Sequence, residues 1–125
     1  DLNRTPLKIE QDAQSFFAIN KRKDFEETSE LKLLLKRIDG YLADGNQQPL
    51  IIYGSSGRGK STLMSKAIKE AENASQKKML YCFIGVTPNS SSSKKILTSM
   101  FEELCIDIRS EYEKRESEDK KKRLS

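Results

Sequence analysis

The 125-residue sequence contains no histidine and only two cysteines, Cys82 and Cys105. The lack of histidine excludes catalytic triads with an imidazole base and all His-ligated metal sites. Two cysteines are too few for a disulfide scaffold, and they indicate a reducing compartment. No apolar run approaches the roughly 18–20 residues that span a bilayer, and no apolar segment typical of a signal peptide follows the first residues. We therefore expect a cytoplasmic protein without a membrane partner.

Apolar residues are also scarce, whereas charged residues are abundant. Charged residues make up 34% of the chain, with 23 Lys and Arg against 19 Asp and Glu, which gives a net charge of +4. The mean hydropathy of −0.71 indicates that part of the chain is solvated helix or tail. The basic runs Lys21–Lys23 and Lys120–Arg123 are flanked by acidic residues and lack interleaved aromatic residues. Solvated surface is therefore favoured over a nucleic-acid partner.

The spacing of apolar residues predicts three amphipathic helices. Apolar residues recur at intervals of three and four from Ser29 onward, over residues 62–73 and over residues 94–108. Thr28 or Ser29 can cap the first of these helices, and Gly45 with Asn46 can end it.

Two continuous apolar runs, at residues 50–53 and 79–86, are too short for helices and indicate buried strands. The second run is apolar on both faces, which is typical of parallel sheets covered by helices. The order helix, strand, helix, strand, helix therefore predicts an α/β fold, in which a partial parallel sheet with a βαβ core is preceded by helices.

One motif lies between the first predicted strand and the helix that follows it. The segment fits the pattern G-x-x-x-x-G-K-[ST] of the phosphate-binding P-loop. Its residues are Gly54, Ser55, Ser56, Gly57, Arg58, Gly59, Lys60 and Ser61, with Thr62 next in the chain.

The chemistry of phosphate binding explains these residue types. Glycines let the backbone turn sharply and approach phosphate oxygens, while successive N–H groups at a helix start form a nest for an anion. We expect Lys60 to reach the β- and γ-phosphates, Ser61 to offer its hydroxyl to Mg²⁺, and Thr62 to reach the α-phosphate. Arg58 occupies a variable position of the motif that usually faces solvent.

Residues around the motif resemble a known class of proteins. Three segments, Pro49–Gly54, Lys60–Met64 and Phe83–Pro88 with the serines after it, are similar to the N-terminal part of STAND-type NTPase domains, the NACHT-like, AAA-related ATPases. The resemblance covers about residues 14–110. It implies a signalling switch that binds ATP or ADP with Mg²⁺ and forms a homo-oligomer in the full-length protein.

One part of that class is missing from the chain. P-loop NTPases hold Mg²⁺ and orient the attacking water with a second, acidic motif at the end of an apolar strand. No apolar strand follows Val86, so we expect an incomplete three-layer α/β/α domain that does not hydrolyse ATP alone and contains no catalytic residue. Alternatives are another P-loop ATPase of the AAA+ type, or a truncated, non-catalytic interaction module.

The sequence thus predicts three consecutive parts. Residues 1–28 form an N-terminal linker or helical segment, and residues 29–110 form the N-terminal half of a P-loop NTPase domain. Residues 111–125 form a charged tail that leads to the missing remainder.

Overall fold

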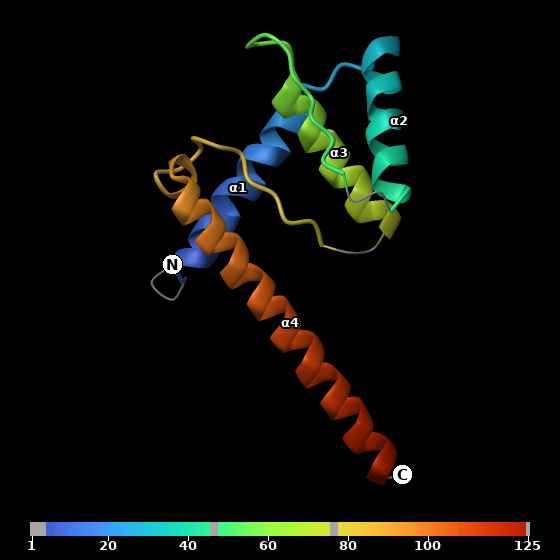
Figure 1. Ribbon diagram of the computed structural model, residues 1–125, viewed down its shortest axis with the longest axis vertical. Helices are drawn as coiled ribbons and strands as arrows, with labels where there is room; N and C mark the ends of the chain where they lie inside the picture. Colours follow the sequence, from blue (N-terminus) through green and yellow to red (C-terminus); the bar gives the residue numbers. More distant parts are fainter. Residues whose placement is uncertain (1–4, 46–47, 76–77, 125) are drawn as a thin grey trace. The chain divides into compact units, whose positions relative to one another are not determined.

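The computed structural model describes residues 5–45, 48–75 and 78–124, and within these ranges it contains helices but no strand (Figure 1). The elements in chain order are α1 (Pro6–Lys23), α2 (Ser29–Ala43), α3 (Lys60–Ser75), the short 3-10 helix η1 (Asn89–Ser91) and α4 (Ser93–Leu124). The chain divides into two compact units. The first unit comprises Asp12–Phe83, and the second combines the residues up to Gln11 with those from Ile84 onward.

Helix α2 begins and ends where its capping residues predict. The Thr28 Oγ1 accepts a hydrogen bond from the Leu31 N–H at 3.2 Å, which satisfies a donor of the first turn. At the other end Asp44 caps the helix, and Gly45 has a φ of +67°, in the left-handed region that favours glycine. The prediction for this helix is confirmed, and Asn46 lies outside the described residues.

Helices α2 and α3 form the apolar core of the first unit. They lie side by side and run in the same direction, and residues 48–59 run back to the end at which both helices begin (Figure 1). The core consists of Leu35, Ile38, Leu63 and Ala67, against which Phe25 and Ile52 pack. Because Ile52 lies just before the P-loop motif and Leu63 just after it, this core fixes both ends of the motif.

The predicted α/β fold is wrong for the part of the chain that the structure describes. The chain is extended at residues 50–53 and 78–83 but forms no strand ladder there. Neither apolar run is buried as predicted, because Ile51 is 78% exposed and Ile84 lies 80% exposed in a turn. A strand needs a neighbouring backbone to take up its N–H and C=O groups. Helices joined by extended connections therefore replace the predicted parallel sheet and its incomplete three-layer α/β/α domain.

A side chain takes the place of a neighbouring strand at the second extended segment. Gln14, buried on α1, accepts a hydrogen bond from the Phe83 N–H through Oε1 at 2.7 Å and donates to the Phe83 carbonyl through Nε2 at 3.2 Å. The rings of Phe17 and Phe83 pack with their centroids 4.9 Å apart. The hydroxyls of Ser15 and Tyr81 lie 3.2 Å apart. One amide thus supplies both hydrogen bonds that a strand would give to Phe83.

The second unit is organised around the turn that precedes α4. The Thr87 hydroxyl donates to the Glu10 carboxylate, whose two oxygens both lie 2.8 Å away. Ser90, only 1% exposed, accepts from the Thr87 N–H through Oγ at 2.8 Å and donates its own N–H to the Thr87 hydroxyl at 3.0 Å. These bonds join the start of α1 to the turn.

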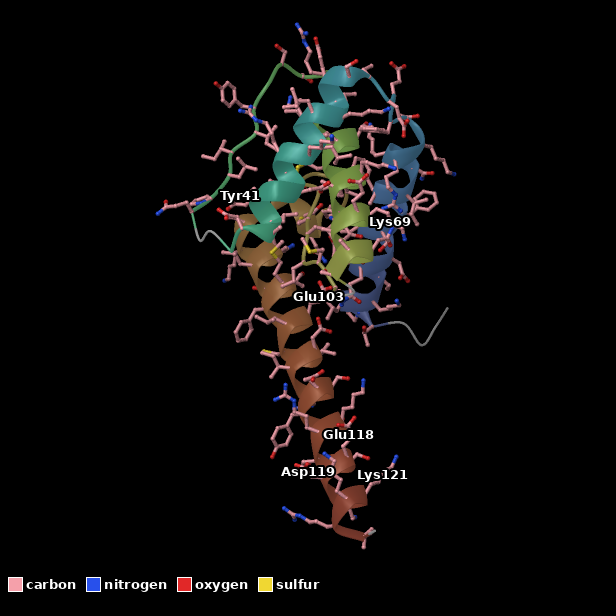
Figure 2. The ribbon with its side chains drawn as sticks, turned by 90° about the vertical axis from the view of Figure 1, so that its right-hand side faces the viewer. Tyr41, Lys69, Glu103, Glu118, Asp119 and Lys121 are labelled. Carbon is pink, nitrogen blue, oxygen red and sulfur yellow. The ribbon has the colours of Figure 1, made fainter. Side chains whose placement is uncertain are left out.

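Helix α4 continues to Leu124, well beyond its predicted end at Ile108. Within this extension Arg115 Nε lies 3.4 Å from Glu111 Oε1, an (i, i+4) pair of the kind that supports an exposed helix. Figure 2 shows the side chains of Glu118, Asp119 and Lys121 projecting outward from the same part of α4. Among the described residues, no helix is long and apolar enough to cross a membrane.

Candidate phosphate-binding loop

The P-loop motif forms a sharp turn between the extended chain at 50–53 and the start of α3 (Figure 1). The Arg58 N–H donates to the Ser55 carbonyl at 3.3 Å, which closes the turn. Gly57 and Gly59 have φ angles of +81° and +83°, a region that costs other residues roughly 1–2 kcal/mol. The backbone conformation therefore accounts for glycine at these two positions.

The ammonium group of Lys60 folds back over the turn. Lys60 Nζ donates to the Gly54 carbonyl at 2.6 Å and to the Ser55 carbonyl at 2.8 Å. A Cβ on Gly57 or Gly59 would meet no atom within 4 Å, so the turn borders open space at both glycines. The turn therefore carries a positive charge, and both of its left-handed glycines face open space.

Helix α3 starts directly from this turn. Its first intrahelical hydrogen bond runs from the Leu63 N–H to the Gly59 carbonyl at 2.9 Å. In an α-helix the N–H groups of the first turn have no carbonyl partner within the helix, and here these groups belong to residues 60–62. The first turn of α3 contains no acidic residue, so no carboxylate there offsets the positive end of the helix dipole. Ser61 is exposed and Thr62 is half-buried at this helix start.

The structure brings all nine predicted site residues, Gly54 to Thr62, into one turn and the helix start that follows it. Every residue from Gly54 to Gly59 is exposed, including Ser55, Ser56 and Arg58. Backbone N–H groups at a helix start and an ammonium group are donors that suit a phosphate group. The Ser61 hydroxyl is the kind of oxygen ligand that Mg²⁺ accepts beside a bound phosphate.

Two carboxylates pair between α2 and α3, but they lie far from this turn. Burial raises the pKa of the Glu70 carboxyl, and a hydrogen bond to Asp39 and the charge of Asp39 raise it further. Lys66 lowers the pKa of Glu70, and Glu27 raises it. Glu70 follows Lys60 by ten residues, about 15 Å along the helix axis, so it cannot share an ion with Ser61. Within the described ranges no group of three or more metal-binding side chains could hold a metal ion.

The polar contacts that organise the two units could not be predicted from the sequence. Gln14 and Phe83 are 69 residues apart, and Glu10 and Thr87 are 77 apart. The spacing of residues within one helix or extended segment does not predict contacts between residues so far apart in the chain. The start of α1 did carry a signal, because Thr5 precedes Pro6, and the Thr5 Oγ1 accepts a hydrogen bond from the Lys8 N–H at 3.1 Å.

Comparison with known proteins identifies one family. The family model described as "Nephrocystin 3, N-terminal" matches residues 15–124, which include the whole turn, α2 and α3 and all of α4. No curated protein and no solved structure shows a significant match to the chain. Since the match extends over most of the sequence, the chain belongs to the Nephrocystin 3 N-terminal family.

Proposed function

We propose that this protein binds the phosphate chain of a nucleoside triphosphate, together with Mg²⁺, through residues 54–62. The observation that carries the proposal is the position of the Lys60 ammonium group, 2.6 and 2.8 Å from two carbonyls of the turn. This contact holds a positive charge on the turn from which α3 starts. An anion at that place would gain from the charge, from the N–H groups and from the helix dipole at once.

Backbone groups and side chains of residues 54–62 would bind different parts of the ligand. The N–H groups of Gly57 and of residues 59–62 bind phosphate oxygens, and Gly57 and Gly59 let the backbone approach them without a Cβ in the way. Lys60 binds the β- and γ-phosphates, and Thr62 binds the α-phosphate. Ser61 offers its hydroxyl to Mg²⁺, which neutralises phosphate charge when it is bound.

The resemblance to STAND-type ATPases supports adenosine nucleotides as the ligands. On that basis we infer that ATP and ADP binding act as a signalling switch and that the full-length protein forms a homo-oligomer. Among the described residues, the paired Glu70 and Asp39 carboxylates lie about 15 Å along α3 from Lys60, too far to orient a water molecule beside Ser61. We therefore expect binding without hydrolysis by these 125 residues.

Isothermal titration calorimetry with Mg-ATP tests this proposal on the whole chain. Lys60→Ala should weaken binding about tenfold to a hundredfold, since a hydrogen bond to a charged group contributes about 1.5–3 kcal/mol. The matched control is Lys69→Ala, which removes the same charge from an exposed position farther along α3, labelled in Figure 2. This variant should bind Mg-ATP as the unaltered chain does.

Two results would contradict the proposal. One is the absence of Mg-ATP binding by the unaltered chain at millimolar nucleotide. The other is an equal loss of affinity in Lys60→Ala and Lys69→Ala, which would mean that only the overall charge of α3 attracts nucleotide.

A further inference from the structure

One face of α4 is apolar yet exposed. The side chains on this face follow one another at intervals of four, three and four residues, and each of these residues is between 45% and 68% exposed. They are Leu97, Phe101, Leu104 and Ile108. None of the residues of α4 is buried. Intervals of four and three place side chains in the seam by which one helix packs along another in a coiled coil.

Charged residues occupy the next seam positions on either side. Lys94 lies three residues before Leu97, and Glu111 lies three residues after Ile108. The seam therefore consists of four apolar positions bounded by one positive and one negative charge. With this arrangement, parallel and antiparallel pairs of the helix differ in their charge interactions.

In a parallel pair of identical helices, each seam residue faces its own copy. Lys94 would then face Lys94 and Glu111 would face Glu111, so like charges would repel at both ends. In an antiparallel pair, one register sets Leu97 opposite Ile108 and Phe101 opposite Leu104. The same register sets Lys94 of each helix opposite Glu111 of the other, so every seam residue meets a complementary one.

We propose that α4 pairs with α4 of a second copy of this chain, antiparallel and in this register. The interaction is independent of nucleotide, because it uses no residue of the turn at 54–62. The apolar seam spans about two heptads, fewer than the three to four that a stable coiled coil usually needs, so the dimer is weak and depends on concentration. The pairing of Lys94 with Glu111 at the ends of the seam then contributes measurably to the affinity of the dimer.

Analytical ultracentrifugation of the whole chain over a range of concentrations tests the pairing. Lys94→Glu and Glu111→Lys should each weaken dimerisation about tenfold, because each places like charges opposite one another at both ends of the seam. The double variant restores opposite charges and should return to within about threefold of the unaltered chain. Lys95→Glu and Glu113→Lys are matched controls beside the seam and should change little.

The rescue separates this model from a general effect of charge. Glu111 also lies 3.4 Å from Arg115 within its own helix, and the loss of that contact would not be repaired by changing Lys94. Leu104→Lys should abolish the dimer, while circular dichroism should show unchanged helix content because the position is exposed. A chain that is monomeric at all concentrations, a dimer that resists Leu104→Lys, or a double variant no tighter than either single variant would each overturn the proposal.

Discussion

Replacing Gln14 by leucine should destabilise the first unit, because it leaves the backbone of Phe83 without two hydrogen bonds. Gln14 is 5% exposed and binds both the N–H and the carbonyl of Phe83, at 2.7 and 3.2 Å. A polar group left buried without a partner costs about 1–3 kcal/mol. Phe83 is half-buried, so its two groups keep some access to water. We expect a loss of about 2 kcal/mol, or about thirtyfold in the ratio of folded to unfolded chain.

Amide hydrogen exchange measures this loss at the Phe83 N–H, and urea denaturation measures it in the unfolding of the chain. In Gln14→Leu the Phe83 N–H should exchange faster, and the midpoint of unfolding should fall. Gln14→Glu keeps an oxygen that can accept from the Phe83 N–H but loses the donor to the carbonyl, so exchange at Phe83 should stay slower than in Gln14→Leu. Asn20→Leu, at an exposed position of α1, should change the free energy of unfolding by less than about 0.5 kcal/mol. Equal exchange rates of the Phe83 N–H in Gln14→Leu and the unaltered chain would refute the reasoning.

Two further predictions concern the second unit and the pH dependence of the first. Thr87→Val should lower the melting temperature, because it removes about 1–2 kcal/mol of hydrogen bonding to the Glu10 carboxylate and the Ser90 N–H. Thr87→Ser keeps the hydroxyl and should melt as the unaltered chain does. Equal melting temperatures of the two variants would contradict this role of the hydroxyl. The pKa of Glu70 is raised above 4.5 in the folded chain, so the protonated carboxyl group contributes to the stability of the fold. This contribution is fully present below pH 4.5 and is lost as the pH rises through the raised pKa. Glu70→Gln should therefore melt at a higher temperature than the unaltered chain at neutral pH and at the same temperature below pH 4.5. An equal difference in melting temperature at the two pH values would contradict this prediction.

The helices were predictable where short-range signals are strong. Thr28 and Gly45 bound α2 as the sequence predicts, and the apolar spacing after Lys60 marks α3. These signals act within one or two turns, so they require no knowledge of the rest of the chain. The end of α4 was missed because its last turns have no apolar face, and pairs such as Glu111 with Arg115 support the helix instead.

The strands were mispredicted because a strand depends on a partner that the local sequence does not contain. The run that includes Phe83 has the composition of a buried strand, but its backbone binds the Gln14 side chain. For the turn at 54–62 the motif specified residue types, and the structure adds the position of Lys60 Nζ on two carbonyls. That contact depends on the side-chain conformation of Lys60 and on the path of the turn, which the motif alone does not determine.

The pairing of Gln14 with Phe83 also bears on the order in which the first unit folds. Its two partners are 69 residues apart, whereas Leu35 and Leu63 of the α2–α3 core are much closer in the chain. Closing a longer loop costs more conformational entropy, so the helix pair can form early and the extended segment joins α1 afterwards. The same ordering makes the contact between α1 and Phe83 the first part of this unit to open. The helix pair that fixes the turn at 54–62 can then persist through such partial unfolding.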